Sequence, residues 1–235
     1  MSIAENVSAI KEKMRAAAVA AGRDPDKILL CAATKMNDSD AVRQAIAAGV
    51  DCCGENRVQE LVQKLGENAY DGAPVHFIGH LQTNKVKQVV GKVDLIQSVD
   101  SLRLLEVIHK EALKQGIIQD ILLEINIGEE ASKSGFTLEE IPALLPEMGK
   151  YGNIRIRGLM AIPPISQNPG DNCKFFEKIY ALSVDISAKK YDNISVDVLS
   201  MGMSDDYADA IACGSTMIRV GTAIFGARNY ANSHL

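Results

Sequence analysis

The chain has 235 residues, of which 47% are apolar and 23% are charged, a balance typical of a globular protein with enough apolar material for a core. A formal net charge of −5 without any Lys/Arg-rich run gives no electrostatic basis for binding nucleic acid. No stretch approaches the ~18 consecutive apolar residues of a membrane span, and the N-terminus lacks a signal-peptide pattern, so we expect a cytoplasmic protein.

The N-terminal segment predicts a helix. Apolar residues recur at helical spacing from Ile3 to Ala18, Ser2 and Glu5 form a capping box, and Gly22 ends the pattern. Beyond it, short apolar segments alternate with helical segments. The predicted strands are 28–34, 51–54, 75–79, 94–99, 120–127, 154–161, 194–201 and 217–225. The predicted helices are 41–49, 57–67, 83–92, 101–115, one opened by a capping box at Thr137 and Glu140, 173–189 and 205–214.

This alternation predicts a parallel sheet, because parallel strands need crossover helices between them. Eight strand–helix units with nothing left over favour closure into a single (β/α)₈ barrel, a TIM barrel, that spans residues 1–235. Residues 1–22 form its extra N-terminal helix and residues 229–235 a C-terminal tail. An open, doubly wound sheet is the alternative fold.

The cysteines and histidines do not predict a metal site. The five cysteines form no C-x-x-C pair and have no metal-ligand spacing, and the four histidines are scattered. Most of the cysteines stand in apolar or small-residue surroundings, where cysteine packs as a small core residue. We therefore expect a structural role for them.

Reactive groups of such barrels lie at the C-terminal ends of the strands, and a phosphate often sits after strands 7 and 8. Both ends are rich in small and hydroxyl residues here, at 199–204 and 219–223. Backbone N–H groups and hydroxyls at these turns can converge on an anion, although glycine and serine are also ordinary turn residues.

Two cations stand at this end of the predicted barrel. Lys35 closes the first strand and points toward the mouth, either as a solvated lysine or as a Schiff-base lysine. In the last strand, Ile218 and Val220 face the helices, which points Arg219 into the barrel. A buried arginine requires an acceptor, which is either an internal partner or a ligand atom.

The chain resembles the YggS/PROSC family of pyridoxal phosphate homeostasis proteins along nearly its whole length. The matching segments are 33–35 (ATK), 54–60 (GENRVQE), 76–85 (HFIGHLQTNK), 130–135 (EASKSG), 157–162 (RGLMAI), 199–206 (LSMGMSDD) and 214–226 (GSTMIRVGTAIFG). The family fold is the barrel of the N-terminal domain of alanine racemases. In this sequence, Met36-Asn37 replaces a usual Thr-Lys after the lysine, Arg57 replaces a frequent tyrosine, and Val75 replaces a tryptophan.

The resemblance implies that pyridoxal 5′-phosphate binds as a Schiff base on Lys35. Arg219 then faces the pyridine nitrogen and Asn56 lies near the ring. The residues that the resemblance assigns to the phosphate are Ser200, Gly221 and Thr222.

A carrier function is favoured over catalysis. An arginine cannot accept the proton that makes the ring a strong electron sink, and racemases add a tyrosine base from a second domain that this chain lacks. We expect a monomer that binds the cofactor and delivers it to apo-enzymes. The alternatives are an amino-acid racemase, with Tyr207, His80 or another group at the barrel mouth as second base, and a sugar-phosphate enzyme with Lys35 bound to substrate.

Overall fold

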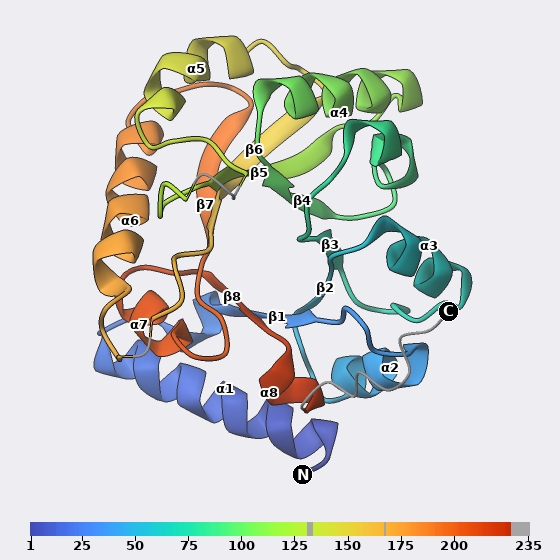
Figure 1. Ribbon diagram of the computed structural model, residues 1–235, viewed down its shortest axis with the longest axis vertical. Coiled ribbons are helices and arrows are strands. Elements are labelled where there is room, and N and C mark those ends of the chain that lie inside the picture. The colour runs from blue at the N-terminus through green and yellow to red at the C-terminus, as the bar shows by residue number, and fades with distance from the viewer. Residues whose placement is uncertain (131–133, 167, 227–235) are drawn as a thin grey trace.

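The computed structural model describes residues 1–130, 134–166 and 168–226. Within these residues, parallel strands close into a barrel in which each strand pairs with the next along the chain and β8 pairs with β1 (Figure 1). The strands are β1 (Leu29–Ala33), β2 (Cys52–Glu55), β3 (Val75–Phe77), β4 (Leu95–Val99), β5 (Gln119–Ile125), β6 (Ile154–Ala161), β7 (Ile194–Ser200) and β8 (Met217–Val220).

Helices surround the barrel on its outer side (Figure 1). The α-helices are α1 (Ile3–Ala20), α2 (Ser39–Ala47), α3 (Val58–Gly66), α4 (Leu102–Gln115), α5 (Glu140–Met148), α6 (Cys173–Ser187), α7 (Tyr207–Ala212) and α8 (Thr222–Phe225). Two 3₁₀ helices, η1 (Pro25–Lys27) and η2 (Thr83–Gln88), complete the set. The N-terminal helix α1 packs across α7 and α8, so it covers the barrel where the last strand meets the first.

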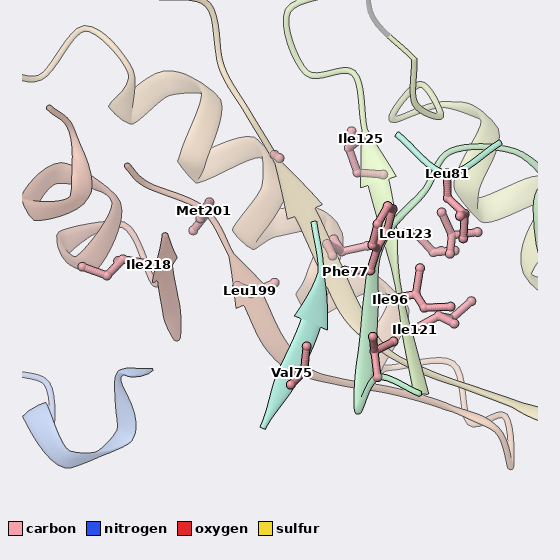
Figure 2. Packing of buried hydrophobic residues seen from close by; sticks show 14 of the residues in the cluster. Val75, Phe77, Leu81, Ile96, Ile121, Leu123, Ile125, Leu199, Met201 and Ile218 are labelled. Carbon is pink, nitrogen blue, oxygen red and sulfur yellow. The ribbon is translucent and has the colours of Figure 1, made fainter. Parts of the chain in front are cut away.

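The core has two layers because strand side chains alternate between the two faces of the barrel wall. The outer layer lies between strands and helices and includes Phe77, Ile96 and Leu123 (Figure 2). The interior holds two smaller apolar clusters: Cys31, Cys52 and Met217, and Leu95, Leu122 and Met160.

The closed barrel confirms the predicted (β/α)₈ fold and rules out the open sheet. The predicted helix at 83–92 is wrong, because a 3₁₀ helix ends there at Gln88. Gln82 offers no side-chain cap, and Gly91 adopts the left-handed conformation, with φ +74°. The short segment between them closes with i→i+3 hydrogen bonds, such as Val89 N–H to Val86 O at 2.9 Å.

The predicted eighth strand is also too long. It ends at Val220, and the chain turns at Gly221 into helix α8. An apolar run such as Ala223-Ile224-Phe225 fits a strand and a helix equally well, since a short apolar segment carries no distinguishing period.

Both capping boxes predicted from the sequence are present in the structure. Ser2 and Glu5 form the capping box of α1, and Thr137 and Glu140 exchange hydrogen bonds before α5.

None of the described helices combines the length and apolar character that a membrane span requires. The expected tail at 229–235 and the motif residues 131–133 lie outside the described residues.

Candidate functional site

A cavity of ≈ 510 Å³ lies at the C-terminal ends of the strands. Its volume is within the range of small-molecule sites. Five of the six cofactor residues expected from the sequence line it: Lys35, Asn56, Arg219, Gly221 and Thr222. The sixth, Ser200, is fully buried and is not part of the lining.

Lys35 follows β1 and is held by anchored neighbours. The Thr34 hydroxyl donates to Glu55 Oε1 at 2.6 Å, and the Thr34 amide donates to Gly54 O at 2.9 Å. On the other side, the Met36 amide donates to Glu60 Oε2 at 2.7 Å, and Met36 adopts a φ of +60°. The chain therefore turns sharply just after Lys35, and the lysine stands at the rim of the cavity.

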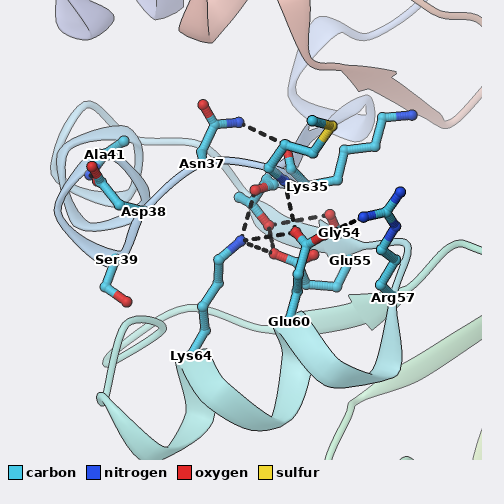
Figure 3. A network of polar contacts seen from close by, with 12 residues as sticks. Lys35, Asn37, Asp38, Ser39, Ala41, Gly54, Glu55, Arg57, Glu60 and Lys64 are labelled. Carbon is cyan, nitrogen blue, oxygen red and sulfur yellow. Dashed lines mark hydrogen bonds and ion pairs between the residues drawn. The ribbon is translucent and has the colours of Figure 1, made fainter. Parts of the chain in front are cut away.

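A buried polar network supports this turn from below. Lys64 Nζ donates to Thr34 O at 2.8 Å and to Glu55 Oε1 at 2.5 Å, and Tyr70 Oη donates to the same carboxylate oxygen at 2.9 Å. Glu55 is 0% exposed and Lys64 5%. Burial and the Glu55 carboxylate raise the pKa of Tyr70. In Figure 3, Glu60 and Lys64 reach from α3 toward the segment around Lys35.

Asn56 follows β2 directly. Its side-chain Oδ1 is buried and has no hydrogen-bond partner among the described residues. Gly79 packs directly against the backbone of Asn56, so closely that a Cβ added at Gly79 would lie 2.1 Å from Asn56 O. A buried acceptor without a partner is costly in a finished core and is suited to a bound ligand.

Arg219 points into the barrel, as the alternation along the last strand predicts. Its Nη1 donates to Ser200 O at 2.6 Å and to Ser200 Oγ at 2.5 Å, and its Nη2 donates to Ala161 O at 3.0 Å. The Ser200 hydroxyl in turn donates to Gln97 Oε1 at 2.6 Å. Burial lowers the pKa of Arg219. The structure therefore places Ser200 where it holds the guanidinium, below the cavity floor.

The two turns expected to bind phosphate do meet at this cavity. Gly221 and Thr222 follow β8, and Ser204 follows β7. The first N–H groups of α8 have no acceptor within the helix, because i→i−4 bonding begins one turn later. Ser204 lines the cavity although the sequence does not single it out as a cofactor residue. Its signal was its position just beyond the strand end, whereas Ser200 lies within the strand.

Neither of the two expected second bases, Tyr207 and His80, lines the main cavity. Tyr207 is buried in the core between barrel and helices and does not line the cavity, and burial raises its pKa. His80 is exposed, with Nδ1 3.1 Å from Asp100 Oδ2. It lines a smaller neighbouring pocket of ≈ 310 Å³, which shares Lys35 and Asn56 with the main cavity.

Glu124, at the end of β5, gives this region a pH dependence. Burial, with a smaller contribution from Asp100, raises the pKa of Glu124 from its ordinary value of 4.5 to about 7, while Arg219 opposes the shift. Between these two pH values the folded chain keeps a proton that the unfolded chain has released. Stability from this group is therefore full below pH 4.5 and is lost as the pH rises through about 7.

We expect the variant Glu124→Gln to remove this dependence. Urea unfolding at several pH values should show wild type losing stability relative to the variant between pH 4.5 and about 7, with no further change above. Glu12→Gln, at an exposed position of α1, is the control and should follow wild type. Parallel profiles for wild type and Glu124→Gln would contradict the assignment.

The chain matches the family model described as "Alanine racemase, N-terminal domain" over residues 2–229. It is 39% identical to the pyridoxal phosphate homeostasis protein of Aquifex aeolicus over 98% of this chain and 100% of the relative. Among solved structures, PipY of Synechococcus elongatus with PLP bound has a TM-score of 0.82 at 31% identity, over 96% of this chain and 100% of PipY. Alanine racemase of Clostridium difficile has a TM-score of 0.70 at 15% identity, over 95% of this chain and 56% of that chain, a likeness of fold alone.

Proposed function

Since the chain belongs to the family of pyridoxal phosphate homeostasis proteins, we propose that it binds pyridoxal 5′-phosphate at the barrel mouth and holds it covalently through Lys35 Nζ. The observation that carries the proposal is the convergence of Lys35, Arg219 and the turn at Gly221 on one cavity. A nucleophilic amine, a cation and an anion-binding turn match the aldehyde, ring nitrogen and phosphate of that cofactor.

The residues present fit this group. The unpartnered Asn56 Oδ1 is an acceptor that a bound ligand can satisfy. At the phosphate end, we propose backbone N–H groups at Gly221 and Thr222 together with the hydroxyls of Thr222 and Ser204 as donors. Ser200 supports this arrangement by fixing Arg219.

We propose a carrier and not an enzyme. Bound pyridoxal phosphate supplies a reactive aldehyde and a conjugated ring that can accept electrons. Arg219, fixed by Ser200 and Ala161, presents only donors to this cavity and cannot accept a proton from a ring nitrogen. Tyr207 is held in the core, which removes one of the second bases that a racemase would use.

We further propose that the chain acts as a cytoplasmic monomer that releases its cofactor to apo-enzymes. Exposed residues line the cavity at Met203, Thr222 and Ala223, so the cavity reaches the surface of the barrel. A bound ligand can therefore enter and leave through this opening.

The test is the absorption spectrum of the chain incubated with pyridoxal phosphate. Wild type should develop a visible imine band, and borohydride should trap the cofactor on Lys35, as located by peptide mass spectrometry. Lys35→Ala should show neither, whereas Lys13→Ala, at an exposed position of α1, should behave as wild type. A wild-type chain that takes up no cofactor would overturn the proposal.

The same samples separate carrier from racemase. Alanine in deuterated water should exchange its Cα proton no faster with the loaded chain than with free pyridoxal phosphate. Steady exchange that depends on Lys35 would support the racemase alternative.

A further inference from the structure

Three side chains of types that can ligate a metal meet inside the barrel wall. Cys31, Cys52 and His76 come from the neighbouring strands β1, β2 and β3. Cys31 and Cys52 are register partners, and the strand that carries His76 pairs with β2. One ligand atom of each residue lies within 4.8 Å of the other two. All three are buried, with 0%, 2% and 6% exposure respectively.

The surroundings of this cluster hold the histidine ring in place and leave space beside the thiols. The Gln97 amide nitrogen donates to His76 Nδ1 at 2.9 Å, which fixes the ring and places the proton of the neutral imidazole on its other nitrogen. An ion at the other ring nitrogen therefore requires the ring proton to move to Nδ1 and the Gln97 amide to turn so that its oxygen accepts from Nδ1–H, the arrangement usual for metal-ligating histidines. Gly54 makes room beside the thiols, because a Cβ there would lie 2.9 Å from Cys31 Sγ.

We propose that Cys31, Cys52 and His76 bind one d¹⁰ metal ion, Zn²⁺ or Cu⁺, in the barrel interior. A metal ~2.3 Å from sulfur and ~2.1 Å from nitrogen places its ligand atoms roughly 3.5–4 Å apart, so the cluster needs only a small contraction. Thiolate and imidazole ligands select these two ions over Mg²⁺ or Ca²⁺, which prefer oxygen.

Charge and proton balance agree with this ligand set. Both thiols lose their protons to solvent on binding, and two thiolates neutralise Zn²⁺ or leave one negative charge with Cu⁺. Arg219 is the register partner of Cys31 on β8, so a remaining negative charge faces a cation. The Met217 thioether belongs to the same buried cluster as both cysteines and accepts from Gln97 Nε2 at 3.2 Å, and a soft sulfur beside the ligands favours Cu⁺ over Zn²⁺.

The site is linked to the cavity above it. Gln97 contacts His76 through its amide nitrogen and Ser200 through its amide oxygen, and Ser200 holds Arg219. The proposal does not depend on cofactor binding, since none of the three ligands lines the cavity.

The test is the metal content of the full chain, produced with added zinc sulfate or copper sulfate and purified with a phosphine reductant. Wild type should carry about one equivalent of one ion. Cys31→Ala, Cys52→Ala and His76→Gln should each lower that content at least tenfold. Cys53→Ala is the matched control, because Cys53 is a buried neighbour that faces the outer layer, and it should retain the metal.

Metal-free wild type from both media would overturn the proposal, as would retention by Cys52→Ala or a Cys31–Cys52 disulfide in place of metal. If a variant fails to fold, anomalous diffraction from wild-type crystals at the zinc and copper edges decides the question. A peak among the three side chains supports the site and identifies the ion, and a peak elsewhere or none rejects it.

Discussion

Lys64→Met should lower the free energy of unfolding by about 3–5 kcal/mol. The substitution keeps the apolar stem but removes the ammonium that contacts Glu55 and the carbonyl of Thr34. Glu55 is fully buried, and its Oε2 already has no hydrogen-bond partner among the described residues. Thr34 and Tyr70 would still donate to Oε1, but a buried carboxylate would remain without a counter-ion.

Urea denaturation of wild type, the single variant and the double variant Glu55→Gln/Lys64→Met measures this effect. The double variant should regain more than half of the loss, because its neutral amide can keep the contacts to Thr34 and Tyr70 without a buried charge. Lys87→Met, at an exposed position of η2, should change stability by less than about 0.5 kcal/mol. Equal losses in the single and double variants would show that the charge is not the cause.

The sequence alone predicts the barrel because its signals are local. Each strand is a short apolar run, each helix has its own period and cap, and their alternation leaves few topologies. The same local logic places Lys35 at the mouth and Arg219 inside, since strand position and alternation decide both. The sequence does not predict the end of an element where a short apolar run fits both a strand and a helix, as at the end of β8.

The rest of the site depends on contacts between segments far apart in sequence. Lys64 has the sequence context of any lysine on an amphipathic helix, and only the fold places it against Glu55. Ser200 is on the inward face of β7, where Arg219 occupies its hydroxyl, so the resemblance alone could not separate it from Ser204. The same dependence on the fold explains why no metal-ligand spacing in the sequence indicates Cys31, Cys52 and His76. Separate strands supply them, and linear spacing does not detect such a set.

Gly79→Ala should raise the dissociation constant for pyridoxal phosphate at least tenfold and lower stability by about 1–3 kcal/mol. The added Cβ would lie 2.1 Å from Asn56 O, 2.6 Å from Asn56 Cα and 2.7 Å from Asn56 C. These are backbone atoms, so no side-chain rotation relieves the contact. The Asn56 segment must move, and its side chain moves with it in the cavity.

Gly66→Ala is the matched control, because a Cβ added at Gly66 would meet no atom within 4 Å beyond its chain neighbours and the backbone of its own helix. It ends helix α3, where alanine should leave cofactor affinity unchanged and alter stability by no more than about 1 kcal/mol. Absorbance titration with pyridoxal phosphate and urea unfolding measure the two effects in both variants. If Gly79→Ala loses stability but binds the cofactor as wild type does, Asn56 serves the fold and not the ligand. If it loses affinity more than global destabilisation explains, the close approach of the two turns is what holds Asn56 in place to bind.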